Sequence, residues 1–175
     1  KLKDNIDFTK KIILVTGHRR ESFGKGFENV CNAILEIGKN KEVEIVYPVH
    51  LNPNVQETVF KMLSGLANIH LIQPLDYPSF IWLMSKSSLI ISDSGGIQEE
   101  APSLNVPVLV TRKTTEREEG INLGFSHLVG TNTSEIVDKS LELINCHNKS
   151  NMKKNPYGDG TASKKIVNFI KNNIH

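Results

Sequence analysis

Short, unbroken apolar runs alternate along the sequence with segments whose apolar residues recur every three or four positions. Helical periodicity of this kind is clear over Phe27, Val30, Cys31 and Ile34. Strands that are buried on both faces keep continuous apolar runs, and a strand–helix–strand order makes neighbouring strands parallel. The sequence therefore predicts an open, doubly wound, mostly parallel α/β sheet. Its strands are expected at residues 11–16, 43–47, 69–73, 89–92, 108–111 and 127–129.

Several residues in the segments between these strands mark where helices begin or end. Gly38 is expected to end the first helix, and Asn52 followed by Pro53 is typical of a capped helix start. Asn132 with Glu135 resembles a capping box for a later helix. Further helices are expected from Pro78 and from near Gly95, and residues 145–154 are interpreted as a surface linker. A final helix is expected to carry Ile166, Val167, Ile170 and Ile174.

Composition excludes several classes of protein. A chain of 175 residues supports one well-packed core but not two large domains. With 21 basic and 19 acidic residues the net charge is +2, so we expect no nucleic-acid partner. No apolar run approaches the roughly 20 residues that cross a membrane. The polar first ten residues show no signal peptide, so we expect a cytoplasmic protein, and the missing initial Met is consistent with an excised fragment.

Cys31 and Cys146 lie far apart and show no metal-type spacing. We expect both to be buried thiols. No set of His, Cys, Asp and Glu has the spacing of a metal site, and neither a Ser–His–Asp arrangement nor a Walker motif is present. The sequence therefore predicts no metal and no cofactor.

Polar, cationic and glycine residues follow five of the predicted strands. In a doubly wound sheet, ligands bind at the carboxyl ends of the strands, so these segments are expected to meet at one edge. They are residues 17–21, 48–50, 74–77, 93–96 and 112–117.

The strongest of these signals is the sequence DSGGIQEE at residues 93–100. A strand ends, Gly95 and Gly96 follow, and a helix begins, so free backbone N–H groups can receive a phosphate or diphosphate beside the Ser94 hydroxyl. The alternative is a glycine-softened turn in which Ser94 is a plain N-cap. Glu100 lies one turn after Gly96 on the same helix face, where a carboxylate suits a pair of ribose hydroxyls. Glu99 points elsewhere and reads as a solvated or structural acid.

Other candidate residues come from the neighbouring segments. His18, Arg19 and Arg20 follow the first strand in a glycine-rich loop, and Arg117 is able to reach the same anion. The alternative for both segments is a charged surface with local ion pairs. His50 by itself is more often a structural histidine, and Phe80 either flanks a base or belongs to the core. The residues alone lead to an α/β domain with an anion site, for which a nucleotide diphosphate is the expected ligand.

Five longer motifs together resemble the non-hydrolysing UDP-N-acetylglucosamine 2-epimerases. They are TGHRRESFGKGFENV (16–30), YPVHLNPNV (47–55), DSGGIQEEAPSL (93–104), PVLVTRKTTERE (107–118) and NPYGDG (155–160). The resemblance covers only the C-terminal half of that family. It implies that residues 1–175 form the Rossmann-like, UDP-binding domain of a two-domain, GT-B-type enzyme whose N-terminal catalytic half is absent.

The resemblance also implies roles for individual residues. His18 would lie near the UDP phosphates as a catalytic residue, with Ser94, Gly95 and Gly96 as the diphosphate cradle. The remaining UDP ligands would be Leu75 and Phe80 beside uracil, Glu100 on the ribose and Arg117 on a phosphate. In some members a second UDP-N-acetylglucosamine binds as an activator, and His18, Arg19 and His50 would lie near it.

The family reaction interconverts UDP-GlcNAc and UDP-ManNAc by elimination of UDP to 2-acetamidoglucal and re-addition. The implied partners are UDP and UDP-N-acetylhexosamine, with a homodimer for the full-length enzyme. The fragment alone is expected to bind UDP without epimerising the sugar. Three alternatives stay open: a hydrolysing 2-epimerase, the donor domain of a GT-B glycosyltransferase, and a non-catalytic nucleotide-sensing module.

Overall fold

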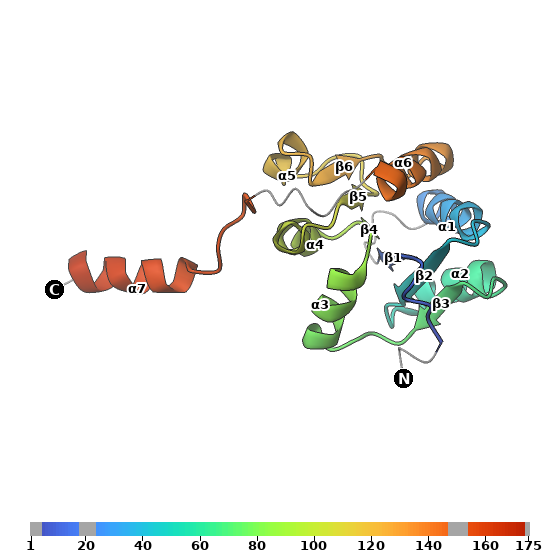
Figure 1. Ribbon diagram of the computed structural model, residues 1–175, viewed down its shortest axis with the longest axis horizontal. Coiled ribbons are helices and arrows are strands. Elements are labelled where there is room, and N and C mark those ends of the chain that lie inside the picture. Colours follow the sequence, from blue (N-terminus) through green and yellow to red (C-terminus); the bar gives the residue numbers. More distant parts are fainter. Residues whose placement is uncertain (1–4, 18–23, 147–153, 174–175) are drawn as a thin grey trace.

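A six-stranded sheet forms the centre of the molecule. The computed structural model describes residues 5–17, 24–146 and 154–173 of the 175-residue chain. All strand pairs are parallel, in the order β3-β2-β1-β4-β5-β6. The predicted doubly wound, parallel fold is therefore confirmed (Figure 1). The strands are β1 (Lys11–Thr16), β2 (Val43–Pro48), β3 (Ile69–Ile72), β4 (Leu89–Ser92), β5 (Val108–Val110) and β6 (Ser126–Leu128).

Helices connect successive strands and cover both faces of the sheet (Figure 1). Neighbouring strand residues point to opposite faces, so the two apolar clusters divide β1 between them. Ile13 and Val15 pack with α1, α2 and α6, whereas Ile12 and Leu14 pack with α3, α4 and the 3₁₀ helix η3. The helices are α1 (Lys25–Gly38), α2 (Pro53–Leu63), α3 (Tyr77–Lys86), α4 (Gly95–Glu100), η3 (Ala101–Leu104), α5 (Glu118–Asn122), α6 (Thr133–Cys146) and α7 (Ala162–Asn173).

Side-chain caps fix the starts of three helices. The Asn52 side chain accepts a hydrogen bond from the Asn54 N–H at the start of α2, and the Asn132 side chain accepts bonds from the first turn of α6. The predicted Asn52 cap is confirmed, and so is the Asn132 half of the predicted capping box, in which Asn132 Oδ1 accepts the Glu135 N–H. A third cap was not predicted: Asp76 accepts a bond from the Ser79 N–H and so starts α3, which carries Phe80, at a defined residue.

The bounds of several elements and the burial of one cysteine need correction. Helix α3 begins at Tyr77 rather than Pro78, and α6 continues to Cys146, into the segment expected to be a linker. The last strand begins at Ser126, one residue earlier than expected. Cys31 is buried as predicted, but the prediction that Cys146 is buried is wrong. Cys146 is the last residue of α6 and lies beyond the turn whose Leu143 and Ile144 enter the core.

The final helix differs from all the others. Figure 1 shows α7 projecting away from the sheet and its covering helices. Ile166, Val167 and Ile170, which were expected to mark this helix, are exposed, and so is Phe169; Ile174 lies outside the described residues. Within the described residues, no helix combines the length and the apolar character needed to span a membrane.

Candidate functional site

The strand order reverses between β1 and β4, and this is where the candidate site lies. From β1 the chain builds the sheet outward through β2 and β3, and from β4 it builds in the opposite direction. Thr16 and Ser92 are register partners at the carboxyl ends of these strands, and their hydroxyl oxygens lie 2.7 Å apart. In open α/β sheets the crevice at such a reversal is where ligands bind.

A cavity of about 220 Å³ opens at this reversal. Four residues predicted from sequence, His50, Leu75, Phe80 and Ser94, line it together. They come from four separate segments that follow β2, β3 and β4 or begin α3. The expected convergence at one sheet edge is therefore found for these segments. The other lining residues are Thr16, Gly17, Pro48, Pro74 and Ile97.

The start of α4 has the features of an open backbone surface. Ser94 is the N-cap residue, but its side chain makes no capping hydrogen bond, so its hydroxyl is not used to close the helix. A Cβ atom added at Gly96 would meet only the Ser94 hydroxyl oxygen, at 3.8 Å. The plain side-chain cap considered as the alternative is therefore not what the structure contains, and the backbone at Gly96 is open to approach.

Arg117 lies against Gly95. A Cβ atom at Gly95 would be 3.4 Å from Cζ and from Nη2 of Arg117, so any side chain there would press on the guanidinium. Glu99 Oε1 holds the guanidinium, accepting from Nε and Nη2 at 2.8 Å each. Glu116 lies 3.4 Å from Nη1. The structure thus brings Arg117 to the start of α4 and makes Glu99 its ion-pair partner.

A hydrogen-bond chain that the sequence analysis missed connects these two elements. The buried Gln98 side chain donates to the Ser94 carbonyl at 3.2 Å and accepts from the Thr115 hydroxyl at 2.8 Å. The Thr115 hydroxyl oxygen in turn accepts the Arg117 N–H at 3.2 Å. Glutamine supplies a donor and an acceptor from one side chain, which this bridge requires. The sequence did contain a signal for this bridge, because Gln98 is a polar residue on the core side of a predicted helix.

Two further contacts fix the opposite wall of the cavity. Tyr47, fully buried on β2, donates its hydroxyl to the Gly17 carbonyl at 3.2 Å, and burial raises the pKa of this phenol. His50 Nδ1 accepts the Asn52 N–H at 3.1 Å. A neutral His50 therefore carries its ring proton on Nε2.

Four predicted site residues that the structure describes are not part of the cavity lining: Gly95, Gly96, Glu100 and Arg117. Glu100 lies half-buried at the end of α4, one turn after Gly96. His18 and Arg19 lie outside the described residues, so the structure places neither the predicted catalytic histidine nor two of the three residues expected near an activator.

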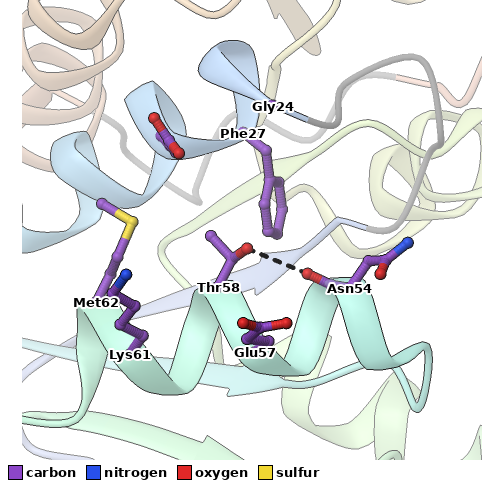
Figure 2. A pocket seen from close by; sticks show the side chains of 8 residues that line it. Gly24, Phe27, Asn54, Glu57, Thr58, Lys61 and Met62 are labelled. Carbon is purple, nitrogen blue, oxygen red and sulfur yellow. Dashed lines mark hydrogen bonds between the residues drawn. The ribbon is translucent and has the colours of Figure 1, made fainter.

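A second cavity of about 480 Å³ lies between α1 and α2 (Figure 2). Figure 2 shows the Phe27 ring pointing from α1 toward α2, where the Thr58 hydroxyl donates to the Asn54 carbonyl. Glu28 and Glu57 supply two carboxylates against the single ammonium of Lys61. This balance of charge repels a diphosphate, so the larger cavity is not the better anion site.

The donors of a metal centre do not gather anywhere in the part of the chain that the structure describes. Over residues 5–17, 24–146 and 154–173, no three His, Cys, Asp or Glu side chains form a group that could hold an ion.

The fold and the site together define a Rossmann-like α/β domain of the kind that makes up one half of a GT-B-type enzyme. A glycotransferase of kitacinnamycin has a similar fold, with a TM-score of 0.57 over 80% of this chain and 35% of its own, at 14% identity. That likeness shows the fold alone.

Within this class, the chain belongs to the UDP-N-acetylglucosamine 2-epimerase family, whose model matches residues 1–171. A UDP-N-acetylglucosamine 2-epimerase of Yersinia pestis is 54% identical over 171 residues, which are 95% of this chain and 46% of that protein. The solved UDP-GlcNAc 2-epimerase of Neisseria meningitidis bound to UDP-GlcNAc has a TM-score of 0.90 and 48% identity, covering 96% of this chain and 46% of its own. The chain thus spans less than half the length of these relatives.

Proposed function

We propose that residues 1–175 are the UDP-binding half of a UDP-N-acetylglucosamine 2-epimerase that interconverts UDP-GlcNAc and UDP-ManNAc. The observation that carries this proposal is the cavity at the β1–β4 reversal, which gathers Leu75, Phe80 and Ser94 next to the Gly95–Arg117 contact. An apolar wall for a base and a backbone-and-guanidinium surface for a diphosphate lie within one site.

The proposed reaction depends on stabilising UDP as a leaving group. No carbonyl is attached directly to C2 of the sugar, so direct deprotonation and return at that carbon is difficult. Elimination to 2-acetamidoglucal instead moves an electron pair onto the β-phosphate oxygen. The N–H groups of Gly95 and Gly96, the Ser94 hydroxyl and Arg117 then meet the developing negative charge, with His18 adding a donor. The same groups retain UDP for re-addition on the other face.

The remaining contacts hold the nucleoside. Leu75 and Phe80 flank uracil, and Glu100 accepts hydrogen bonds from the two ribose hydroxyls. The pairing of Arg117 with Glu99 supports this geometry, because the guanidinium is already oriented over Gly95 before a phosphate arrives. The carboxylates that move the C2 proton belong to the absent half, so this fragment binds UDP without turnover.

Calorimetric titration of UDP into the chain tests the site. Replacing Glu100 by Ala removes a charged acceptor and is expected to weaken UDP binding by roughly 1.5–3 kcal/mol, or about 10- to 150-fold. Ser94→Ala is expected to weaken it by a smaller factor, since one neutral donor is lost. The matched control is Glu57→Ala, which removes an exposed helical carboxylate from the second cavity. Equal affinities for wild type, Glu100→Ala and Ser94→Ala would refute the assignment.

Product analysis of the full-length enzyme separates the alternatives. A hydrolysing enzyme releases free N-acetylmannosamine, a glycosyltransferase consumes the donor only when an acceptor is added, and a sensor binds UDP without converting the sugar. The QEEAP (98–102) and TERE (115–118) segments favour the non-hydrolysing type. An activator site at His18, Arg19 and His50 predicts sigmoidal kinetics in UDP-GlcNAc, and a homodimer predicts twice the monomer mass by light scattering.

A further inference from the structure

The segment that leads to α7 is fastened to the candidate site. The Tyr157 hydroxyl accepts the Gly120 N–H at 2.8 Å and donates to the Arg117 carbonyl at 3.0 Å. This one hydroxyl therefore both donates and accepts a hydrogen bond on the turn between Arg117 and the first residues of α5. Burial raises the pKa of this phenol, so it keeps the proton that it donates.

Asn155 makes the matching contact on α4. Its Nδ2 donates to the Glu99 carbonyl at 3.0 Å and to the Ser103 hydroxyl at 2.7 Å. Its Oδ1 accepts the Tyr157 N–H at 2.9 Å, which links the two side chains into one unit. The backbones of both partners in the Glu99–Arg117 ion pair are therefore held by neighbouring residues of a segment far away in sequence.

The Thr115 hydroxyl accepts the Arg117 N–H, but α5 has no side-chain cap from its own N-cap residue. Arg117 occupies the N-cap position of α5 with φ −108° and ψ 59°, and its side chain makes no capping bond. Gly120 is packed so closely that a Cβ atom there would lie 2.8 Å from the Tyr157 hydroxyl oxygen. The tyrosine hydroxyl therefore accepts a first-turn N–H, that of Gly120, which a side-chain cap would otherwise accept.

We propose that Tyr157 and Asn155 are positioning residues of the nucleotide site, which hold the backbones of Arg117 and Glu99 so that the guanidinium stays over Gly95. This inference rests on the proposed function, because it assumes that Arg117 meets the diphosphate. Binding and positioning are then linked in both directions. UDP bound at Arg117 stabilises the contacts of residues 155–157, and loss of those contacts weakens UDP binding.

A double-mutant cycle in the full-length enzyme tests the proposal, with UDP affinity measured by calorimetry and KM and kcat measured for UDP-GlcNAc. Tyr157→Phe removes only the hydroxyl, and it is expected to weaken UDP by roughly 3- to 10-fold, the equivalent of one neutral hydrogen bond. The KM rises with it. In an Arg117→Ala background the same change is expected to have no further effect on UDP affinity.

Thr161→Val is the matched control, because it removes a hydroxyl from the same connecting segment whose partner is Asp159 rather than the site. It is expected to leave UDP affinity and KM at their wild-type values. Asn155→Ala, run through the same cycle with Arg117→Ala, provides a second measurement if Tyr157→Phe does not fold.

The outcomes distinguish this inference from the proposed function. If Arg117→Ala weakens UDP while Tyr157→Phe and Asn155→Ala do not, the positioning role is wrong and the nucleotide site stands. If the fold-losses in UDP affinity caused by Arg117→Ala and Tyr157→Phe multiply in the double variant, the tyrosine acts independently of the guanidinium. The inference is then again wrong. If Arg117→Ala leaves UDP affinity unchanged, the assignment of Arg117 fails and the positioning role fails with it.

Discussion

Helices α1 and α7 have the same kind of sequence pattern, but the apolar face of α1 is buried and that of α7 is exposed. Both repeat apolar residues every three or four positions over 14 and 12 residues. In α1 the apolar stripe is enclosed by the sheet and by α2 and α6, and Ile34 is 0% exposed. In α7 the corresponding Ile170 is 46% exposed and the helix lies apart from the sheet (Figure 1). An amphipathic pattern therefore specifies a helix with one apolar face, and a partner must still be present to cover that face.

Truncating equivalent isoleucines gives the largest expected difference. Ile34→Ala leaves a cavity in a closed core and is expected to lower the free energy of unfolding by roughly 2–5 kcal/mol. Ile170→Ala removes atoms that are already in contact with water, so its effect is expected to stay within about 0.5 kcal/mol. Urea unfolding of both variants of this chain measures the contrast. Equal losses would mean that α7 is packed as tightly as α1.

The two cysteines differ in environment, since Cys31 lies on a buried helix face and Cys146 at an exposed helix end. Burial, with a smaller contribution from Glu28, raises the pKa of Cys31 from 9.0 to about 12, whereas Cys146 is exposed. A thiol-reactive chromophore at neutral pH is expected to modify one cysteine in the folded chain and both after denaturation. Cys146→Ser is the variant that should abolish the native-state reaction, and persistence of the reaction would contradict the burial of Cys31.

The same pKa shift predicts how stability changes in alkaline solution. In the unfolded chain the Cys31 thiol ionises near its ordinary value, while in the folded chain it stays protonated up to about pH 12. The unfolded state therefore loses the proton first, so stability falls as pH rises from about 9 toward 12. Cys31→Ala is expected to reduce this slope relative to the wild type, as measured by melting temperature across that range.

The smallest expected effect comes from the Asp159 contacts just before α7. It should change α7 and leave the core unchanged. Asp159 accepts bonds from the Thr161 N–H and hydroxyl and pairs with Lys165, and these contacts lower its pKa. The support is present above about pH 4 and is lost as pH falls through the lowered folded-state pKa. Because a 12-residue helix with no buried residue is marginal, Asp159→Ala is expected to reduce its helicity.

Circular dichroism and amide exchange measure that loss. The exchange protection of β1 and the cooperative melting temperature are expected to remain at wild-type values, because α7 has no buried residue over Ala162–Asn173. A fall in melting temperature comparable to that of Ile34→Ala would show that α7 contributes to the core.

Much of the fold follows from the sequence because its signals are local. The continuous apolar runs gave the strands to within about one residue, and Asn52 and Asn132 marked helix starts through bonds to their own neighbours. The cap by Asp76 has an equally local signal that was not used. The burial of Cys146 was predicted wrongly, because periodicity alone does not say where a helix leaves the core.

The candidate site was predictable in its residue types and not in its connections. The rule that ligands bind at the carboxyl ends of parallel strands was enough to bring His50, Phe80 and Ser94 to one edge. The Glu99–Arg117 pair and the Gln98–Thr115 bridge were missed, since each joins residues 17 or 18 positions apart through side-chain directions that no sequence period encodes.

The sequence by itself determined the strand and helix periods, the parallel strand direction and the presence of polar, cationic and glycine residues at the strand ends. These properties depend on backbone geometry and on neighbours within a few positions. Only the tertiary structure decided which apolar faces are covered, and that Tyr157 meets Arg117 across 40 positions of chain. The physical reason is that hydrophobic burial and hydrogen bonding both depend on distances between segments that only the complete packing sets.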